Sequence, residues 1–472
     1  MSSLCKAKDT SRAVAEKLPQ SVTPAVGDRA LFGAFLLGLA MLLFVAGSAS
    51  CEFRWPIYKA LLSSPSASLG AWMQRMELTS DVLESDLWHV TDYEQRGVVR
   101  HDTNQAFDGY TLFTSAHSTS AYLVDMKGRT VHRWSRSFRD VWNNPPHIPR
   151  PVPDRFIHWR RVHLFPNGDL LAIFVGVGDS PCGYGLVKIE KDSNIVWKYA
   201  GNVHHDLDVQ PDGSIVTLTH EFRPPHEIPH LYTERQTSYT LDDYVVRLSP
   251  DGEQLQKVSV LEALAKSPYD GILRVVENFE WDPLHANSVD VIDSAFAERH
   301  AFSQPGQILI SLRSRDVLAI LDMDDSRIAW ATYGPFHRQH DAEVLSNGNL
   351  LVFDNRGHAG PGGPTRIIEL DPASLEVRWS FAGDEAEWLY SRTRGMQQVL
   401  PNHNLLITEA DGGRILEVTR DGDIVWEFRN PNLHENDQKH IGVVCGAFRF
   451  SKNDLQFPFN GEIATTEEST QP

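Results

Sequence analysis

An internal repeat constrains the fold of this chain more than any other feature. One half of the repeat is a turn followed by a strand, and its copies are LFPNGDLLAIF from Leu164, VQPDGSIVTLT from Val209, VLSNGNLLVFD from Val344 and VLPNHNLLITE from Val399. The other half is a strand, an acidic turn and a second strand, usually with tryptophan. Its six copies span 122–134, 186–199, 245–260, 319–334, 367–383 and 415–428. Short β-branched runs between turn signals predict an all-β chain, and self-similarity of this kind indicates a repeat architecture.

The two halves together supply about four strands, which is what one blade of a β-propeller requires. Six copies of the second half therefore predict a six-bladed β-propeller over residues 106–450. The first copy has no turn half before it, while a strand-like segment, 443–450, follows the last copy. We expect this C-terminal strand to complete the first blade and close the ring. A β-sandwich or a solenoid fits the order of the repeats less well.

An apolar N-terminal segment predicts that the propeller is exported. Residues 30–51 carry no charge, and a run of about 20 apolar residues matches the hydrocarbon core of a bilayer. Basic residues in 1–29 favour a cytosolic N-terminus. We therefore predict one N-terminal transmembrane helix, a single-pass protein, and a propeller on the periplasmic or extracytoplasmic side. A cleaved signal peptide or a lipoprotein site at Cys51 are alternatives that also export the chain.

The remaining segments and the composition narrow the possible partners. Residues 52–105 read as a partly helical connector, and 451–472 as a C-terminal tail. The chain has 62 acidic and 44 basic residues, a net charge of −18, which argues against nucleic acid as the main partner. No CxxC pair is present, so neither a structural zinc site nor a dithiol motif is predicted. Cys182 and Cys445 are equally compatible with one disulfide and with two unpaired thiols.

Repeat positions also predict which side chains gather in one place. His205 and His340 each stand seven residues before the turn Asp or Asn of their half-unit, and Arg160 and Gly395 hold the same slot in theirs. His285 opens the corresponding half of another blade. If this slot begins the innermost strand of each blade, the side chains face one mouth of the central channel.

Two more residues accompany His285. Arg313 ends the strand that follows, and Asn287 lies two residues on, which places it on the same strand face by alternation. A cluster of neutral imidazoles can bind a transition metal. Alternatively, one imidazole can act as a nucleophile while its neighbours and a guanidinium stabilise an anion with several oxygens. The other histidines considered are interpreted as bystanders: His117, His132, His220, His358 and His403.

Several segments carry a resemblance to a known family. They are GYTLFTSAHSTSAYLVDMKGRTVHRW, HHDLDVQPDGSIVTLTHE, HANSVDV, ILISLRSRD, QHDAEVLSNGNLLVFDN and RTRGMQQVLPNHNLLITEADGGRILEVTRDGDIVWEF. Together they resemble the arylsulfotransferase (arylsulfate sulfotransferase) family over roughly 106–450. The resemblance implies an exported six-bladed propeller that moves a sulfuryl group from a phenolic sulfate ester to a phenolic acceptor. It also implies a sulfohistidine intermediate, no nucleotide sulfate donor and no cofactor.

The resemblance assigns roles motif by motif. It implies that His340 is the nucleophile and that His285 and Asn287 bind the anion. It also implies that Arg313 binds the sulfate and that His205 assists. Asp341 directly follows the implied nucleophile, and alternation along a strand predicts that it points outward and fixes a turn. The N-terminal β-domain and the short-range disulfide of the well-known members are missing, which indicates a divergent branch.

Two other classes of function remain open from the sequence. The histidine cluster could serve a metal-binding propeller that acts as a hydrolase or oxidoreductase. The propeller could also be a non-catalytic binding module. The motifs of serine hydrolases, P-loop proteins and HExxH metalloproteases do not occur, so those classes have no support.

Overall fold

The computed structural model describes residues 34–43, 81–179, 182–227, 239–274, 281–356, 364–383 and 388–459. The chain divides into two compact units, 1–66 and 67–472. The described part of the first unit is a helix over 34–43, whose residues are all exposed. The rest of the predicted membrane segment, 30–51, lies outside the described residues. In the parts of the chain that the structure describes, no helix has both the length and the hydropathy needed to span a membrane.

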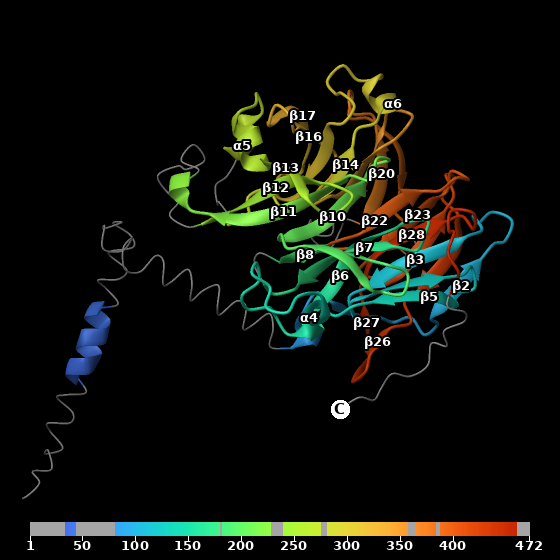
Figure 1. Cartoon of the computed structure of the whole chain (residues 1–472), viewed down its shortest axis with the longest axis horizontal. Coiled ribbons are helices and arrows are strands. Elements are labelled where there is room, and N and C mark those ends of the chain that lie inside the picture. Colours follow the sequence, from blue (N-terminus) through green and yellow to red (C-terminus); the bar gives the residue numbers. More distant parts are fainter. Residues whose placement is uncertain are drawn as a thin grey trace, which may run out of the picture. The chain divides into compact units, whose positions relative to one another are not determined.

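The described residues of the second unit form an all-β fold with six antiparallel sheets of four or five strands. Five of these sheets follow one another along the chain, as Figure 1 shows by its colour gradient. In sheet order they are β6 (Ile157–Leu164), β7 (Leu170–Gly176), β8 (Gly183–Ile189) and β9 (Ile195–Tyr199); β10 (Val203–Val209), β11 (Ile215–Arg223), β12 (Thr240–Leu248) and β13 (Gln254–Ser259); β14 (Ala286–Val291), β15 (Ile308–Leu312), β16 (Val317–Asp322) and β17 (Arg327–Tyr333); β18 (His340–Val344), β19 (Leu350–Asp354), β20 (Arg366–Leu370) and β21 (Val377–Phe381); and β22 (Met396–Val399), β23 (Leu405–Glu409), β24 (Arg414–Val418), β25 (Ile424–Arg429) and β2 (Gly97–His101).

The remaining large sheet joins the two ends of this unit. Its strands are β28 (Val444–Phe450), β3 (Tyr110–Ser115), β4 (Ser120–Val124) and β5 (Thr130–Ser135). The pairing of β28 with β3 confirms the prediction that the strand at 443–450 completes the first repeat. Figure 1 shows the red β28 beside the cyan β3. Strand β2, from the predicted connector, adds a fifth strand to the last sheet, which the repeat did not indicate.

Short elements decorate the sheets. A small sheet contains β1 (Trp88–Val90), β27 (Asp437–Gly442) and β26 (Leu433–His434). The helices α4 (Phe138–Val141), α5 (Val260–Ala265) and α6 (Ser294–Ala297) each begin at a Ser or Asp whose side chain accepts a backbone N–H of the first turn. Short 3-10 turns include η1 (Val82–Glu84), η2 (Asp154–Phe156), η3 (Pro225–Glu227), η5 (Asp270–Leu273) and η6 (Arg313–Arg315).

We call the first strand of each large sheet its inner strand: β28, β6, β10, β14, β18 and β22. Each inner strand contacts two others, in the order β6–β10–β14–β18–β22–β28 and back to β6. The strands next to them are buried on both faces, which explains their continuous apolar runs. In β19, Leu350 and Val352 pack against β16 of the preceding sheet, while Leu351 and Phe353 pack against β23 of the following sheet. The core therefore lies between neighbouring sheets, in a propeller-like arrangement.

The repeated tryptophan joins four of the six large sheets to the next one. In β5, β9, β21 and β25 the indole N–H donates to a carbonyl in a turn of the following sheet, at 2.7 to 3.1 Å. The donor and acceptor pairs are Trp134 and Gly168, Trp197 and Pro250, Trp379 and Arg420, and Trp426 and Met126. The last pair links the C-terminal sheet to the sheet of β3. A buried indole needs a partner for its N–H, so these contacts explain why tryptophan recurs at this place.

A buried ion pair also joins the sheet of β24 to the sheet that contains β28 and β3. Arg449 in β28 pairs with Glu417 in β24 at 3.1 Å, and both side chains have no exposed surface. We predict that Glu417→Ala lowers the free energy of unfolding by about 3–5 kcal/mol, because it leaves a buried guanidinium unpaired. Equilibrium urea unfolding measures this. Asp154→Asn is the control, because its pair with Arg139 is exposed and should contribute little. Equal losses for both variants would contradict the prediction.

Candidate functional site

One cavity collects most of the residues that the sequence singled out. It has a volume of about 320 Å³, and its charged and imidazole lining consists of Arg160, Arg313, Arg394, His158, His205, His285, His340 and Asp86. Four of the five predicted site residues are therefore together: His205, His285, Arg313 and His340. Arg160, which holds the same position in the repeat as His205 and His340, lines this cavity as well. Three guanidinium groups face one carboxylate, so the cavity suits an anion.

Distorted inner strands aim these side chains. The ladders of β6, β10 and β18 each shift register at the slot residue, and the ladder of β14 shifts just after it, between Ala286 and Ser288. His205 and His285 have positive φ angles of 56° and 52°, which non-glycine residues rarely adopt. Bulges of this kind bend a strand and re-aim its side chains, and they recur beside active sites.

The bulge in β14 moves Asn287 away from its predicted place. Alternation put Asn287 on the face of His285, but the register shifts between Ala286 and Ser288. Asn287 instead lines a small adjoining space of about 10 Å³ together with Arg160 and His340. Its amide nitrogen donates to the Gln339 carbonyl at 2.8 Å, and its oxygen has no partner among the described residues. It shares this small space with His340 but does not line the main cavity.

Asp341 also departs from its prediction. It does not point outward to fix a turn, because its φ angle of 45° breaks the alternation of β18. Its carboxylate accepts the backbone N–H of Gln397 at 2.9 Å and pairs with Arg161 at 3.3 Å. It lines a second cavity of about 160 Å³ whose other charged residues are Arg161, Asp206, Asp208, Asp290 and Glu343. Burial raises the pKa of Asp341 to about 6, although Arg161 opposes the rise.

His340 is held as a neutral imidazole with one defined tautomer. Its Nδ1 lies 2.7 Å from Oδ1 of Asn355, whose amide nitrogen donates to the Ser391 and Arg394 carbonyls. The amide oxygen is thus the acceptor, so Nδ1 carries the hydrogen and Nε2 carries the lone pair. Burial, followed by the charges of Arg313 and Arg160, lowers the pKa of His340 well below its usual value. This imidazole can therefore act as a nucleophile at neutral pH.

The sequence did not single out Asn355. A usable signal was present, because Asn355 follows the apolar run VFD, which pairs with the start of β18. The register places His340 opposite Phe353, so a side chain two residues further on can reach the imidazole. The residue is fully buried.

Arg160 is a half-buried cation that can attract an anion. Its guanidinium donates to the Cys445 carbonyl at 2.9 Å, and no carboxylate pairs with it among the described residues. Burial and then the charge of Arg394 lower the pKa of Arg160 to about 10, which still leaves it charged at neutral pH. Arg394 differs, because it pairs with Asp86 at 2.9 Å. A partly desolvated charge without a counter-ion is costly, and an anionic ligand would compensate it.

His158 and the cysteines complete the description of this wall. His158 has no exposed surface, and neither ring nitrogen has a partner among the described residues. Sequence reasoning missed it, although it stands two residues before the slot residue Arg160. Cys182 lines the cavity as well, and burial raises the pKa of its thiol to about 12. Cys182 and Cys445 are both free thiols, which decides between the two alternatives left open above.

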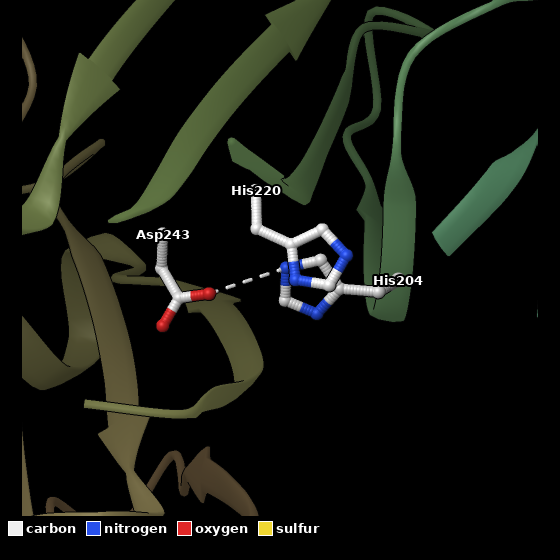
Figure 2. Close-up of side chains that lie close together, drawn as sticks. All are labelled: His204, His220 and Asp243. Carbon is white, nitrogen blue, oxygen red and sulfur yellow. Dashed lines mark ion pairs between the residues drawn. The ribbon is translucent and has the colours of Figure 1, made fainter. Parts of the chain in front are cut away.

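A second group of side chains lies behind His205 and His285. Nδ1 of His205 is 2.7 Å from Nδ1 of His204, and Nδ1 of His285 bonds to the carboxylate of Asp282. Figure 2 shows that the rings of His204 and His220 lie face to face beside Asp243, and their centroids are 4.1 Å apart. His220, interpreted as a bystander, is therefore a buried member of this cluster.

The arrangement of the cluster decides how well it suits a metal ion. One atom each of His204, His220 and Asp243 lies within 4.8 Å of the others, which is the kind of set that can hold a metal. However, the Gly183 N–H donates to Nε2 of His220 at 3.2 Å. A neutral ring that accepts at Nε2 carries its hydrogen on Nδ1, and that nitrogen then has no lone pair for a metal. His220 would have to leave Gly183 to become a ligand.

Comparison with known proteins adds a family. Residues 161–431 match the model of the arylsulfotransferase (ASST) family. A search of curated proteins finds no match. Similar solved structures include a protein of unknown function from Bacteroides caccae, with 11% identity over 72% of this chain and 98% of that chain and a TM-score of 0.46. Virginiamycin B lyase from Staphylococcus aureus has 11% identity over 73% of this chain and 87% of that chain, and a TM-score of 0.37. The WD40 β-propeller domain of Doa1 has 11% identity over 78% of this chain and 99% of that chain, and a TM-score of 0.37.

The buried imidazole of His158 predicts a pH dependence of stability. Burial, then the charges of Arg394 and Arg160, lowers its pKa to about 3. Below pH 6.5 the unfolded state therefore binds a proton that the folded state does not take up until about pH 3, so the free energy of unfolding decreases as the pH is lowered across this window. The unmutated protein loses stability between pH 7 and pH 5, and we expect His158→Leu to make this loss smaller by about 2 kcal/mol. Urea unfolding of both proteins at the two pH values measures it, and parallel curves would contradict it.

Proposed function

Because the chain belongs to the arylsulfotransferase family, we propose that it moves a sulfuryl group from a phenolic sulfate ester to a phenolic acceptor. The reaction would use a sulfohistidine intermediate at His340 and no nucleotide sulfate donor. The observation that supports this most is the pairing of a neutral, oriented imidazole with Arg160 and Arg313 around one cavity. We further propose that the ring of inner strands is a closed six-bladed β-propeller with this cavity at one mouth of its channel.

The first half of the proposed reaction is attack on sulfur. Nε2 of His340 carries the lone pair, since Asn355 fixes the hydrogen on Nδ1. The transferring group spreads negative charge over its oxygens, so donors fixed around it stabilise the transition state. Arg313 and Arg160 would hold these oxygens, and each could contribute about 3 kcal/mol. Asn287 and His285 are proposed as additional donors.

The leaving phenolate must gain a proton, and the acceptor phenol must lose one. His205 and His285 line the cavity with His340, and the centroids of their rings are 5.1 Å apart. Either imidazole is placed to exchange this proton by general acid–base catalysis. Nδ1 of each ring is already bonded, to His204 and to Asp282 respectively, so Nε2 is the nitrogen left for the substrate.

The proposal is tested by incubating the protein with 4-nitrophenyl sulfate and excess phenol. We expect nitrophenol release that depends on phenol, and a sulfuryl adduct on His340 in the mass spectrum of the quenched protein. His340→Ala should lower the rate by at least about 10³-fold, because the nucleophile is lost. His337→Ala is the matched control, since this half-exposed histidine pairs with Asp316 outside the cavity lining.

The same assay separates the other two classes of function. Transfer that survives a chelator supports the histidine nucleophile, whereas loss of activity together with release of a bound metal would favour a metal site at His204, His220 and Asp243. Release at an unchanged rate without phenol would identify a hydrolase. If no ester is cleaved and no adduct forms, a binding module becomes the better hypothesis.

We also propose that residues 30–51 anchor the protein in a membrane, with the β-fold on the periplasmic or extracytoplasmic side. The uncharged length of this segment and the basic residues before it support the proposal. Protease added to spheroplasts, whose outer membrane has been opened, should digest the β-fold while a tag before Met1 stays protected. An N-terminus lost with export of the β-fold would indicate a signal peptide instead. A β-fold protected inside the spheroplasts would contradict both forms of export.

A further inference from the structure

Three side chains lead from the cavity into the buried cluster behind it. His205 lines the cavity, and its Nδ1 lies 2.7 Å from Nδ1 of His204. Nε2, on the other side of the His204 ring, lies 3.5 Å from a carboxylate oxygen of Asp243. His204 and Asp243 are each only 1% exposed, so water has little access to them. The three side chains therefore form a continuous row of atoms that can carry protons.

The surroundings of this row fix its two ends. The second carboxylate oxygen of Asp243 accepts the Ala286 N–H at 2.8 Å, which leaves the first for His204. Nε2 of His204 has no hydrogen-bond partner among the described residues, and the 3.5 Å contact must shorten by a few tenths of an ångström to form one. The ring of His220 covers one face of His204. His205 thus lies at one ring nitrogen of His204 and Asp243 at the other.

Charge separates the two carboxylates of the cluster. Burial and then the charge of Asp282 raise the pKa of Asp243 well above its usual value, and Asp242 adds to the rise. Burial opposes the ionisation of Asp282, but His285 outweighs it and lowers the pKa of Asp282. Neighbouring carboxyl groups with pKa values pushed apart in this way can act as a proton donor and a fixed anion. These opposite directions agree with a proton on Asp243 rather than on Asp282, whose carboxylate bonds to Nδ1 of His285.

His205 cannot supply a proton without help from behind. Burial, then the neighbouring charges of His204 and His285, lowers its pKa well below the usual value, so its imidazolium form is disfavoured. A neutral imidazole that gives up its only N–H becomes an imidazolate, which is far too basic to be left behind in this way. Both difficulties disappear if Nδ1 gains a proton as Nε2 loses one.

We propose that His204 and Asp243 form a proton relay that supplies His205 during sulfuryl transfer. The relay rests on the proposed function, and His204 and Asp243 are positioning residues that act through His205. In the resting state Asp243 carries a proton, His204 carries its proton on Nδ1, and His205 carries its proton on Nε2, which is left for the cavity.

The first half-reaction then balances as follows. A bond forms between Nε2 of His340 and sulfur while the bond from sulfur to the aryl oxygen breaks, and the aryl oxygen keeps the electron pair. That oxygen takes the proton from Nε2 of His205, Nδ1 of His205 takes the proton of His204, and Nε2 of His204 takes the proton of Asp243. The products are a phenol, an N-sulfo imidazolium at His340 and an ionised Asp243, so the total charge does not change.

The second half-reaction runs the relay backwards. The acceptor phenol gives its proton to Nε2 of His205 as its oxygen attacks sulfur, and the protons return along the row to Asp243. His340 is released as a neutral imidazole. Neither half-reaction produces an imidazolium at His205, which its surroundings disfavour.

The test compares donors that need a proton with donors that do not. In single-turnover experiments, Asp243→Asn should slow phenol release from phenyl sulfate by about 10²-fold, the usual contribution of a proton donor. Release from 4-nitrophenyl sulfate should slow by less than about 10-fold, because nitrophenolate leaves unprotonated. Asparagine can keep the contact with the Ala286 N–H but has no proton to give at this pH.

Asp290→Asn is the matched control. Asp290 accepts the Val344 N–H at 2.6 Å, as Asp243 accepts that of Ala286, and it lines the second cavity. Asp290→Asn should change the rates of release from both esters by the same small factor. If Asp243→Asn slowed release from both esters equally, or slowed neither, the relay would be overturned. Unmutated protein that cleaves neither ester would refute the proposed function itself, and the relay with it.

A second measurement needs no variant. In mixtures of light and heavy water, the rate of phenol release from phenyl sulfate by the unmutated protein should curve with deuterium content, because more than one proton moves. A straight line would mean that a single proton moves, and this would overturn the relay even if Asp243→Asn failed to fold.

Discussion

The hydrogen bonds that join the inner strands are the interaction on which the rest of this structure depends. An inner strand is the edge of its sheet, and its N–H groups on that side would be buried without partners. Side chains of the preceding inner strand accept them, as Asp206 does for Val289 and Asp290 does for Val344. Asp341 does the same for Gln397. Because each of these carboxylates needs such a partner, the bonds fix which inner strands are neighbours and how far each strand is shifted along the next.

The same strands separate charge into two cavities. At three of the bulges two consecutive side chains diverge, and the first lines the larger cavity while the second lines the smaller. The consecutive pairs are Arg160 and Arg161, His205 and Asp206, and His340 and Asp341. Arg160, His205 and His340 thus gather on one side, and most of the carboxylates gather on the other. A carboxylate directly after the proposed nucleophile does not repel an anionic substrate, because the bulge turns it away into a contact with Arg161.

The features that depend on the internal repeat could be predicted from the sequence. The slot seven residues before the turn correctly brought His205 and His340 to one cavity with Arg160, and the tryptophans marked contacts between sheets. The errors at Asn287 and Asp341 share one cause, because strand alternation was applied across bulges that the sequence does not reveal. Asn355 and Asp243 were missed for another reason. Their proposed roles depend on the side chain of another residue, and only the fold shows which side chains meet.

Burial explains why the proposed nucleophile, His340, and the proposed proton donor, His205, need different support. Removing His340 from water lowers its pKa and exposes a lone pair to the substrate, which is what attack requires. The same burial deprives His205 of the proton that an acid must hold. A hydrogen bond to an amide is sufficient for His340, because Asn355 only has to fix one tautomer. His205 has to gain a proton at Nδ1 whenever it loses one at Nε2, so its partner must itself titrate. An imidazole backed by a carboxyl group meets that need, and His204 with Asp243 is this combination.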